Sequence, residues 1–297
     1  MGALRSRSVK PAPFEYHAPE STADAVGLLA EHGDEAKPLA GGQSLVPMLA
    51  LRLTRFEHLV DLNRVAELRG VERRGGVLAV GAMTRQAELE RAEAVADVPL
   101  LRLATPLIGH FQIRNRGTVG GSIAHADPAA ELPAVALALD AQLEIATTSG
   151  SRSVAAADFF LGTWETSAAS DELLTGVHFP VWSARAGFAV EEVSRRLGDF
   201  ALVGVACGVE LGDGDAVTRA AIALLGMGST PLRAGAAEAA LVGSTATATD
   251  LAEIGQLAVR DLDPPADIHA SSRYRLAVGA HVVERALARA LEAARSE

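Results

Sequence analysis

The sequence TVGGSIAHADPAAELP, residues 118–133, decides how this chain folds. It contains a glycine pair, Gly120 and Gly121, followed by Asp127-Pro128. Aspartate caps helix N-termini and proline suits the first helical position, so the pattern predicts a helix over 128–139. Adjacent glycines let a backbone approach a ligand and point N–H groups at it. The stretch therefore favours a phosphate site beside a helix N-terminus.

A second glycine pair, Gly41-Gly42, lies in the sequence LAGGQSLVP, residues 39–47. The run over 37–40 predicts a short strand that leads into this pair, and 45–53 is predicted to be helical or irregular. Two loops of this kind can clamp a pyrophosphate if they face each other. We therefore expect the two glycine loops to share one ligand.

The composition is typical of an ordinary globular protein, since 49% of the 297 residues are hydrophobic and 22% are charged. The length suggests two or three domains. A net charge of −10, from 27 basic and 37 acidic residues, argues against general nucleic-acid binding. No apolar run reaches the length of a membrane span, and the basic N-terminus lacks the apolar segment of a secretory signal. Residues 1–12 are therefore predicted to be a disordered lead.

The single cysteine, Cys207, lies in the apolar, strand-like run ALVGVACGV, residues 201–209. One cysteine excludes an intrachain disulfide, and it excludes a cysteine-ligated metal or iron–sulfur site in this chain alone. We expect a buried cysteine side chain and a reducing, cytoplasmic setting.

The spacing of apolar residues predicts an α+β chain with two modules. The first, over 13–180, is predicted to mix short strands with helices and to hold both glycine loops. The second, over 181–297, is predicted to be an antiparallel sheet covered by helices on one side. Its predicted strands are 187–193, 201–211 and 217–225, and its predicted helices are 231–241, 249–259 and 271–294.

The common nucleotide-binding and hydrolase motifs do not occur in the sequence. The nearest match to a Rossmann motif is GMGSTP, residues 226–231, which lacks the third glycine and favours a strand-to-helix turn. There is no P-loop, no GxSxG elbow and no HExxH motif. Six further histidines show no ligand spacing, so no metal site is predicted for His17, His32, His58, His178, His269 and His281.

Several polar side chains near the second glycine loop have more than one interpretation. His110 and His125 either contact a cofactor or are satisfied by backbone groups. Arg114 and Arg116 neutralise phosphate, remain solvated or contact a partner subunit. Glu131 either accepts a hydrogen bond from a ribose or adenine group or is a favourable charge at a helix N-terminus.

The remaining candidates lie elsewhere in the chain. Asp199 is either on the cofactor side or a turn cap beside Arg195 and Arg196. Trp164 and Trp182 are predicted to be packing residues. No pair of side chains suited to general acid–base catalysis stands out, so no catalytic residue is predicted.

Three of the segments above resemble the FAD-binding (medium) subunit of molybdenum hydroxylases, the family of aerobic carbon monoxide dehydrogenase and bacterial xanthine dehydrogenase. They are AGGQSL (40–45), QIRNRGTVGGS (112–122) and DPAAELP (127–133). The resemblance covers nearly the whole chain, because it extends to FEYH (14–17), LLT (173–175) and GDFA (198–201). It implies a two-part FAD-binding domain of the vanillyl-alcohol oxidase (PCMH) type over 13–180, followed by a smaller α+β domain over 181–297.

The resemblance also implies which residues hold a non-covalently bound FAD. The pyrophosphate would contact Ala40, Gly41, Gly42, Gln43, Ser44 and Leu45. The rest of the cofactor would be held by Thr118, Gly121, Ser122, His125, Asp127 and Glu131. Ile108, Leu174 and Phe200 would lie near the isoalloxazine, and the candidate set also includes Gly120 and Asp199.

One departure from the family concerns Glu191-Glu192, which stand where related proteins often carry a lysine near the flavin. A less positive environment stabilises a reduced, anionic flavin less, so it lowers the reduction potential. We therefore expect a lower potential in this chain than in relatives with the lysine.

The resemblance finally implies an oxidoreductase of three kinds of subunit, assembled as a dimer of heterotrimers. A large subunit would carry the molybdenum cofactor and a small subunit two [2Fe–2S] clusters. Electrons would pass from these clusters through FAD to quinone, NAD⁺ or O₂. The setting would be the cytoplasm or the inner face of the membrane, without an integral membrane segment. Two alternatives remain open: a self-contained FAD-dependent oxidase of the vanillyl-alcohol oxidase type, and a flavoprotein without turnover.

Overall fold

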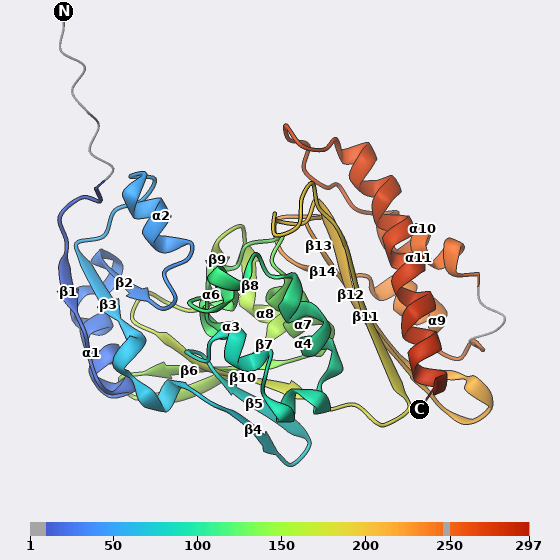
Figure 1. Ribbon diagram of the computed structural model, residues 1–297, viewed down its shortest axis with the longest axis horizontal. Coiled ribbons are helices and arrows are strands. Elements are labelled where there is room, and N and C mark those ends of the chain that lie inside the picture. The colour runs from blue at the N-terminus through green and yellow to red at the C-terminus, as the bar shows by residue number, and fades with distance from the viewer. Residues whose placement is uncertain (1–9, 246–249, 297) are drawn as a thin grey trace, which may run out of the picture.

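The computed structural model describes residues 10–245 and 250–296. Most of the predicted lead over 1–12 lies outside these residues, as does Thr249, the predicted start of a helix. Figure 1 shows three bodies in chain order: a small N-terminal lobe, a central sheet with short helices, and a C-terminal sheet backed by long helices.

The N-terminal lobe is built on a three-stranded parallel sheet with the order β1-β3-β2. Its strands are β1 (Glu15–His17), β2 (Ala36–Leu39) and β3 (His58–Asp61). Helix α1 (Thr22–His32) buries Ala25, Val26 and Leu29 in the core of this lobe. Ser21 caps α1 by accepting a hydrogen bond from the Asp24 backbone N–H at 3.0 Å. Strand β2 leads into the first glycine segment, and α2 (Leu45–Ala50) follows it.

The central sheet has five antiparallel strands in the order β4-β5-β10-β6-β7. The strands are β4 (Val71–Arg74), β5 (Val77–Gly81), β6 (Gln142–Thr147), β7 (Gly150–Ala155) and β10 (Leu173–Pro180). The helices around it are α3 (Gln86–Leu89), α4 (Pro99–Ala104), α5 (Phe111–Arg114), α6 (Val119–His125), α7 (Glu131–Ala138) and α8 (Ala156–Phe159), and a small ribbon is formed by β8 (Phe160–Gly162) and β9 (Glu165–Thr166).

Two predictions made from the sequence for residues 118–133 are wrong. The second glycine segment is not a loop but helix α6, which Thr118 caps by accepting from the Gly121 N–H at 3.1 Å. The next helix, α7, begins at Glu131 instead of residue 128. Asp127 does not cap it, because its Oδ1 accepts from the Ala129 N–H at 2.9 Å in a turn that precedes the helix.

The C-terminal domain is a four-stranded antiparallel sheet with the order β11-β12-β13-β14. Its strands are β11 (Ala186–Val193), β12 (Val203–Leu211), β13 (Val217–Leu225) and β14 (Leu232–Arg233), and its helices are α9 (Gly235–Leu241), α10 (Leu251–Val259) and α11 (Ser272–Ser296). Helices α9, α10 and α11 cover one face, as predicted. The other face is covered by α4 and α7 of the preceding domain, so the prediction of helices on one side alone is incomplete.

The apolar residues of this sheet match its coverage by helices on both faces. Strand β12 is buried almost throughout, so a near-continuous apolar run replaces the alternation of a half-exposed strand. Cys207 at its centre is fully buried, and burial raises the pKa of its thiol to about 12, which confirms the prediction of a buried side chain. In the described part of the chain, none of the helices combines the length and hydrophobicity needed to traverse a bilayer.

Candidate functional site

The two glycine segments are in direct backbone contact. A Cβ atom on Gly41 would overlap the carbonyl oxygen of Arg116 and lie 2.8 Å from the Cα of Gly117. A Cβ atom on Gly121 would lie 3.2 Å from the Cβ of Ala40. Only glycine fits at Gly41 without moving the backbone opposite. The structure therefore brings together the two segments that the sequence predicted to face each other.

Two polar side chains that sequence reasoning missed fasten these segments. Asn63 Nδ2 donates to the carbonyl of Ala40 at 3.1 Å. Arg85 donates both to the carbonyl of Arg116 and to Asn63 Oδ1. No motif contains these residues, since Asn63 follows β3 and Arg85 precedes α3, and only the fold places them between the two segments.

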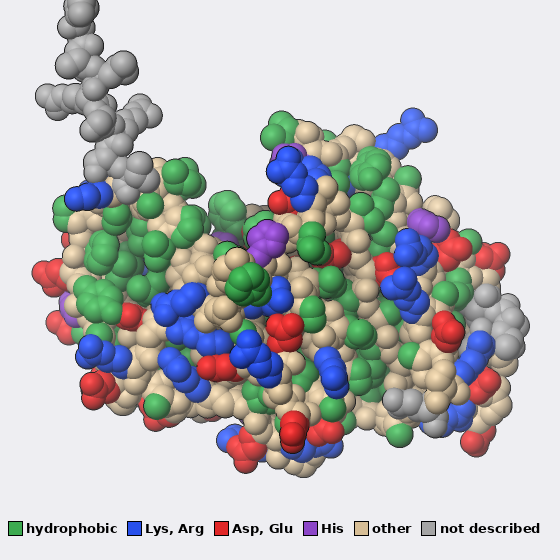
Figure 2. Space-filling model, viewed as in Figure 1, with side chains coloured by type: hydrophobic (Ala, Val, Ile, Leu, Met, Phe, Trp, Pro, Cys, Tyr) green, Lys and Arg blue, Asp and Glu red, His purple; other side chains and the backbone are tan. Residues whose placement is uncertain are grey.

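Positive charge gathers at this contact. Arg85 is only 8% exposed, and burial, together with the charges of Arg116 and Arg69, lowers the pKa of its guanidinium. A guanidinium stays protonated at neutral pH even so, because its ordinary pKa lies above 12. Figure 2 shows basic side chains over the middle of the molecule, between the N-terminal lobe and the C-terminal domain. This field attracts an anionic ligand.

An open cavity of about 340 Å³ lies beside the first glycine segment. Gly42 has a positive φ of +75°, a conformation that favours glycine, and Gln43 Nε2 donates to the Gly41 carbonyl at 3.0 Å to hold the turn. A diphosphate fits this place for three reasons. The backbone at Gly41 leaves no room for a side chain, Arg116 supplies positive charge, and the cavity supplies space. The cavity is lined by Gly41, Gly42, Gln43, Val46, Pro47 and Arg116.

The residues of the second segment divide into two groups. A Cβ atom on Gly120 would overlap the side chain of Ala82. Thr118 is 2% exposed, and its hydroxyl already accepts the capping hydrogen bond from Gly121. These two residues therefore hold α6 against the central sheet. Gly121 and Ser122 are partly exposed and remain accessible to a ligand.

His125 ends α6 and lies in a small polar cluster with Trp164 and Asp127. The rings of His125 and Trp164 stack with centroids 6.1 Å apart, and Trp164 Nε1 donates to Asp127 Oδ2 at 3.3 Å. Trp164 is 59% exposed, so the prediction of a packing residue is wrong for it. Burial lowers the pKa of His125, with a smaller contribution from Lys37, so His125 is neutral at pH 7. Neutral imidazole can both donate and accept a hydrogen bond.

Glu131 is the first residue of α7 and is only 5% exposed. Burial, with smaller contributions from the carboxylates of Glu192 and Asp127, raises the pKa of its carboxyl group to about 8. It therefore carries a proton at neutral pH and can donate a hydrogen bond as well as accept one. The simple alternative of a charge at a helix N-terminus does not describe a buried, protonated group.

The two adjacent glutamates of β11 point to opposite faces of the C-terminal sheet. Glu191 forms ion pairs with Arg285 and Arg289 of α11. Glu192 lies close enough to Glu131 to affect its pKa, and burial raises the pKa of Glu192 itself to about 7. Of the two glutamates, Glu192 therefore lies on the face toward Glu131 and the preceding domain, and the predicted departure from the family bears on this residue.

The residues expected near the isoalloxazine differ in exposure. Ile108 and Leu174 are 9% and 6% exposed and lie in one hydrophobic core. Phe200 is 60% exposed, and Asp199 pairs with Arg195 at 3.4 Å. Their loop rests on His110, because a Cβ atom on Gly198 would lie 2.6 Å from His110 Nδ1.

Three other sequence interpretations are settled by contacts. Arg114 is bound within the domain, since it pairs with Glu90 at 3.1 Å and donates to the Ile108 carbonyl at 3.1 Å. Trp182 is 8% exposed and packs edge-on against Phe188, as predicted. The segment 226–231 is a turn between β13 and β14, so a strand follows it where a helix was predicted.

Two glycine segments in contact beside a cavity and an arginine form a site suited to a cofactor that carries phosphate. Residues 12–182 match the family described as the FAD binding domain in molybdopterin dehydrogenase. Residues 188–290 match the CO dehydrogenase flavoprotein C-terminal domain. Together these two families account for most of the chain.

Individual relatives agree with this class over almost their full length. The chain is 43% identical over 288 residues to the 6-hydroxypseudooxynicotine dehydrogenase complex subunit alpha of Paenarthrobacter nicotinovorans, covering 97% of each chain. It is 38% identical to the carbon monoxide dehydrogenase medium chain of Hydrogenophaga pseudoflava, covering 93% of this chain and 96% of that one.

Solved structures give the same result. The chain superposes with a TM-score of 0.92 and 40% identity on a chain of carbon monoxide dehydrogenase from Hydrogenophaga pseudoflava, covering 95% of this chain and 99% of that one. For quinoline 2-oxidoreductase from Pseudomonas putida 86 the TM-score is 0.90 at 36% identity, covering 96% and 99%. This chain belongs to the family of FAD-binding medium subunits of molybdenum hydroxylases.

The comparisons confirm the predicted family, the α+β fold class, FAD as the cofactor and an oxidoreductase role. They favour a subunit of a heteromeric molybdenum hydroxylase over a self-contained oxidase or a flavoprotein without turnover.

Proposed function

We propose that this chain receives electrons from [2Fe–2S] clusters of a small partner subunit and passes them through FAD to an external acceptor. A large partner subunit would hold the molybdenum cofactor and oxidise the substrate. The proposal is supported by relatives that are medium chains of dehydrogenases and by a single, fully buried cysteine in this chain. Bound FAD supplies redox chemistry in one- or two-electron steps, and the protein supplies binding and electrostatics.

The observation that carries the proposal is the contact between the two glycine segments. We assign the FAD pyrophosphate to Ala40–Leu45 and the cavity shared with Arg116, because the backbone is bare there and the charge is positive. We assign Gly121, Ser122, His125 and Glu131 to the rest of the cofactor, since they lie on or after α6 with accessible or protonated polar groups. Three further residues would support these indirectly. Thr118 caps α6, Gly120 packs α6 against Ala82, and Asp127 holds the turn before α7.

The assembly and the domain limits are proposals of the same kind. The relatives named as medium chains support a complex with large and small subunits, for which we propose a dimer of heterotrimers. We place the domain boundary between Pro180, the last residue of β10, and Ala186, the first of β11. We propose a cytoplasmic setting, because the chain has a single cysteine, Cys207, and that cysteine is buried.

The test compares the purified full-length chain with the same chain co-expressed with its two partner subunits. We expect FAD in both preparations, and reduction of that FAD by the substrate of the complex only when the partners are present. Light scattering of the complex should give the mass of two heterotrimers. Substrate oxidation by the chain alone would contradict the proposal and favour the self-contained oxidase, and a chain that takes up no FAD would contradict both.

A further inference from the structure

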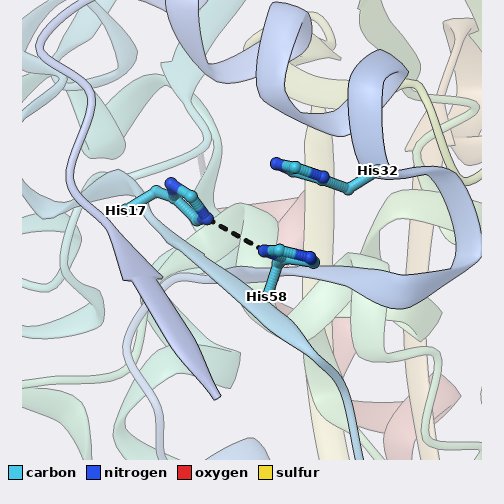
Figure 3. Close-up of side chains that lie close together, drawn as sticks. All are labelled: His17, His32 and His58. Atoms are coloured by element: carbon cyan, nitrogen blue, oxygen red, sulfur yellow. Dashed lines mark hydrogen bonds between the residues drawn. The ribbon is translucent and has the colours of Figure 1, made fainter.

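Three histidines from three elements of the N-terminal lobe meet in one cluster. His17 is the last residue of β1, His32 the last residue of α1 and His58 the first residue of β3. Figure 3 shows the ring of His32 lying over that of His58, with His17 directed at His58 from the side. All three side chains are partly buried. Their spacing along the sequence matches no metal-binding motif, so the sequence alone predicts no role for them.

The ring nitrogens are close enough to share one ion. One nitrogen from each histidine lies within 4.8 Å of the others. His17 Nε2 and His58 Nδ1 share a hydrogen bond of 3.1 Å, which an ion would replace. This separation is near the roughly 3.3 Å that two nitrogens adopt about 2.0–2.1 Å from a tetrahedral zinc ion. The His32 and His58 rings are parallel, with centroids 3.7 Å apart, so His32 must rotate to direct a nitrogen at the same point.

Glu15 is the carboxylate nearest to this cluster that could add a fourth ligand. Glu15 Oε2 is 3.6 Å from His58 Nδ1, and the Glu15 side chain is 75% exposed. Three imidazoles and one carboxylate form a nitrogen-rich set. Such a set selects zinc and the neighbouring late transition metals over magnesium or calcium, which prefer oxygen ligands.

We propose that His17, His32 and His58, with Glu15 as the fourth ligand, bind one divalent transition-metal ion of the zinc class. The ion would join β1, α1 and β3 at a single point. In this parallel sheet Ala36 lies opposite His58, so His58 is at the amino end, whereas His17 lies opposite Val60 at the carboxyl end of β1. The first glycine segment leaves the carboxyl end of the same sheet. The ion would therefore stabilise the lobe that presents this segment.

The test uses the full-length, FAD-loaded chain without a histidine tag, dialysed against zinc chloride. We expect one zinc ion per chain, bound with a Kd below about 1 μM. We expect a loss of at least about 100-fold in affinity for His32→Ala and His58→Ala, and of about 10-fold for Glu15→Gln. Zinc at saturation should raise Tm by on the order of 5 °C, since it binds only the folded state.

The matched control is His269→Ala, because His269 is exposed and lies outside the cluster. This variant should bind zinc like the wild type, and the flavin absorbance of every variant should remain as evidence of folding. His17→Gln provides a conservative substitution if an alanine variant misfolds. Equal zinc affinity in the wild type and the cluster variants would overturn the proposal.

A second measurement needs no variant. Cobalt added to the wild-type chain should give the visible absorption of a tetrahedral Co²⁺ ion with nitrogen ligands, and zinc should displace it. The spectrum of hydrated, six-coordinate Co²⁺ at one equivalent would overturn the proposal. The proposal does not depend on the FAD assignments, since zinc binding and flavin content are measured separately.

Discussion

The two glycine segments carry the same Gly-Gly signature, yet the fold uses the pairs differently. In the first segment, Gly41 lets two backbones touch and Gly42 adopts a positive φ beside an open cavity. In the second, Gly120 lies in a helix and is pressed against Ala82, while Gly121 faces the first segment. A glycine pair thus indicates close approach, but the fold decides whether the approaching group is a ligand or the protein itself.

The largest effect should come from Gly42→Val in the first segment. Valine strongly disfavours the positive φ of this residue, and its branched side chain would crowd Val46 and the cavity. We expect FAD affinity to fall at least about 100-fold, roughly 3 kcal/mol, as measured by flavin fluorescence titration. Gly27→Ala, in an exposed part of α1 with open space around it, is the control and should bind FAD normally.

The corresponding change in the second segment is Gly120→Ala, which should separate stability from binding. The added methyl group overlaps Ala82, so we expect a loss of about 1–3 kcal/mol in the free energy of unfolding of the FAD-free chain. FAD affinity measured below the unfolding transition should change less than threefold. A variant of normal stability that has lost FAD would show that Gly120 faces the ligand.

Glu131→Ala tests the residue that follows the second segment. Removing a buried hydrogen-bonding group should weaken FAD binding by roughly 1–3 kcal/mol if the carboxyl contacts the cofactor. Calorimetric titration with FAD gives this number. Unchanged affinity would restrict Glu131 to a structural role between the two domains.

The same carboxyl group makes stability depend on pH in the FAD-free chain. The folded state holds the proton of Glu131 up to a pKa of about 8, whereas the unfolded state releases it near the ordinary value of 4.5. Unfolding therefore releases a proton between these values, and the free energy of unfolding should fall as pH rises, by at most about 1.4 kcal/mol per pH unit. Urea titrations from pH 5 to 9 should show a shallower fall for Glu131→Gln.

The smallest effect concerns the flavin potential. At pH 8.5 Glu192 is mostly ionised, and removing its negative charge with Glu192→Gln should raise the potential of bound FAD by tens of millivolts. Glu191→Gln is the matched control, since Glu191 faces α11 and pairs with arginines. Equal potentials in wild type and Glu192→Gln would remove this residue from the flavin environment.

The sequence predicted what local chemistry determines. Apolar runs identified β11, β12 and β13, and helical spacing identified α9 to α11. The paired glycines and their order along the chain identified the cofactor family. These signals lie within short stretches, so no tertiary information was needed to find them.

The parts that were missed depend on contacts between distant residues. Two consecutive glycines lower helix propensity, so the sequence predicts a loop over 119–125. The helix forms there because Gly120 packs on Ala82 and Thr118 caps the first turn, and the packing on Ala82 is a contact between distant residues. Asn63 and Arg85 belong to no motif, although they fasten the two segments. The histidine cluster is assembled from the ends of three elements, which spacing along the chain does not reveal.

The central claim is that one FAD lies between the two glycine segments. Amide hydrogen exchange of the full-length chain, measured with and without FAD, tests this claim most directly. We expect FAD to slow exchange in both 39–47 and 116–125, whereas exchange in β12, buried in the C-terminal sheet, should not change. Slower exchange confined to one segment, or absent from both, would contradict it.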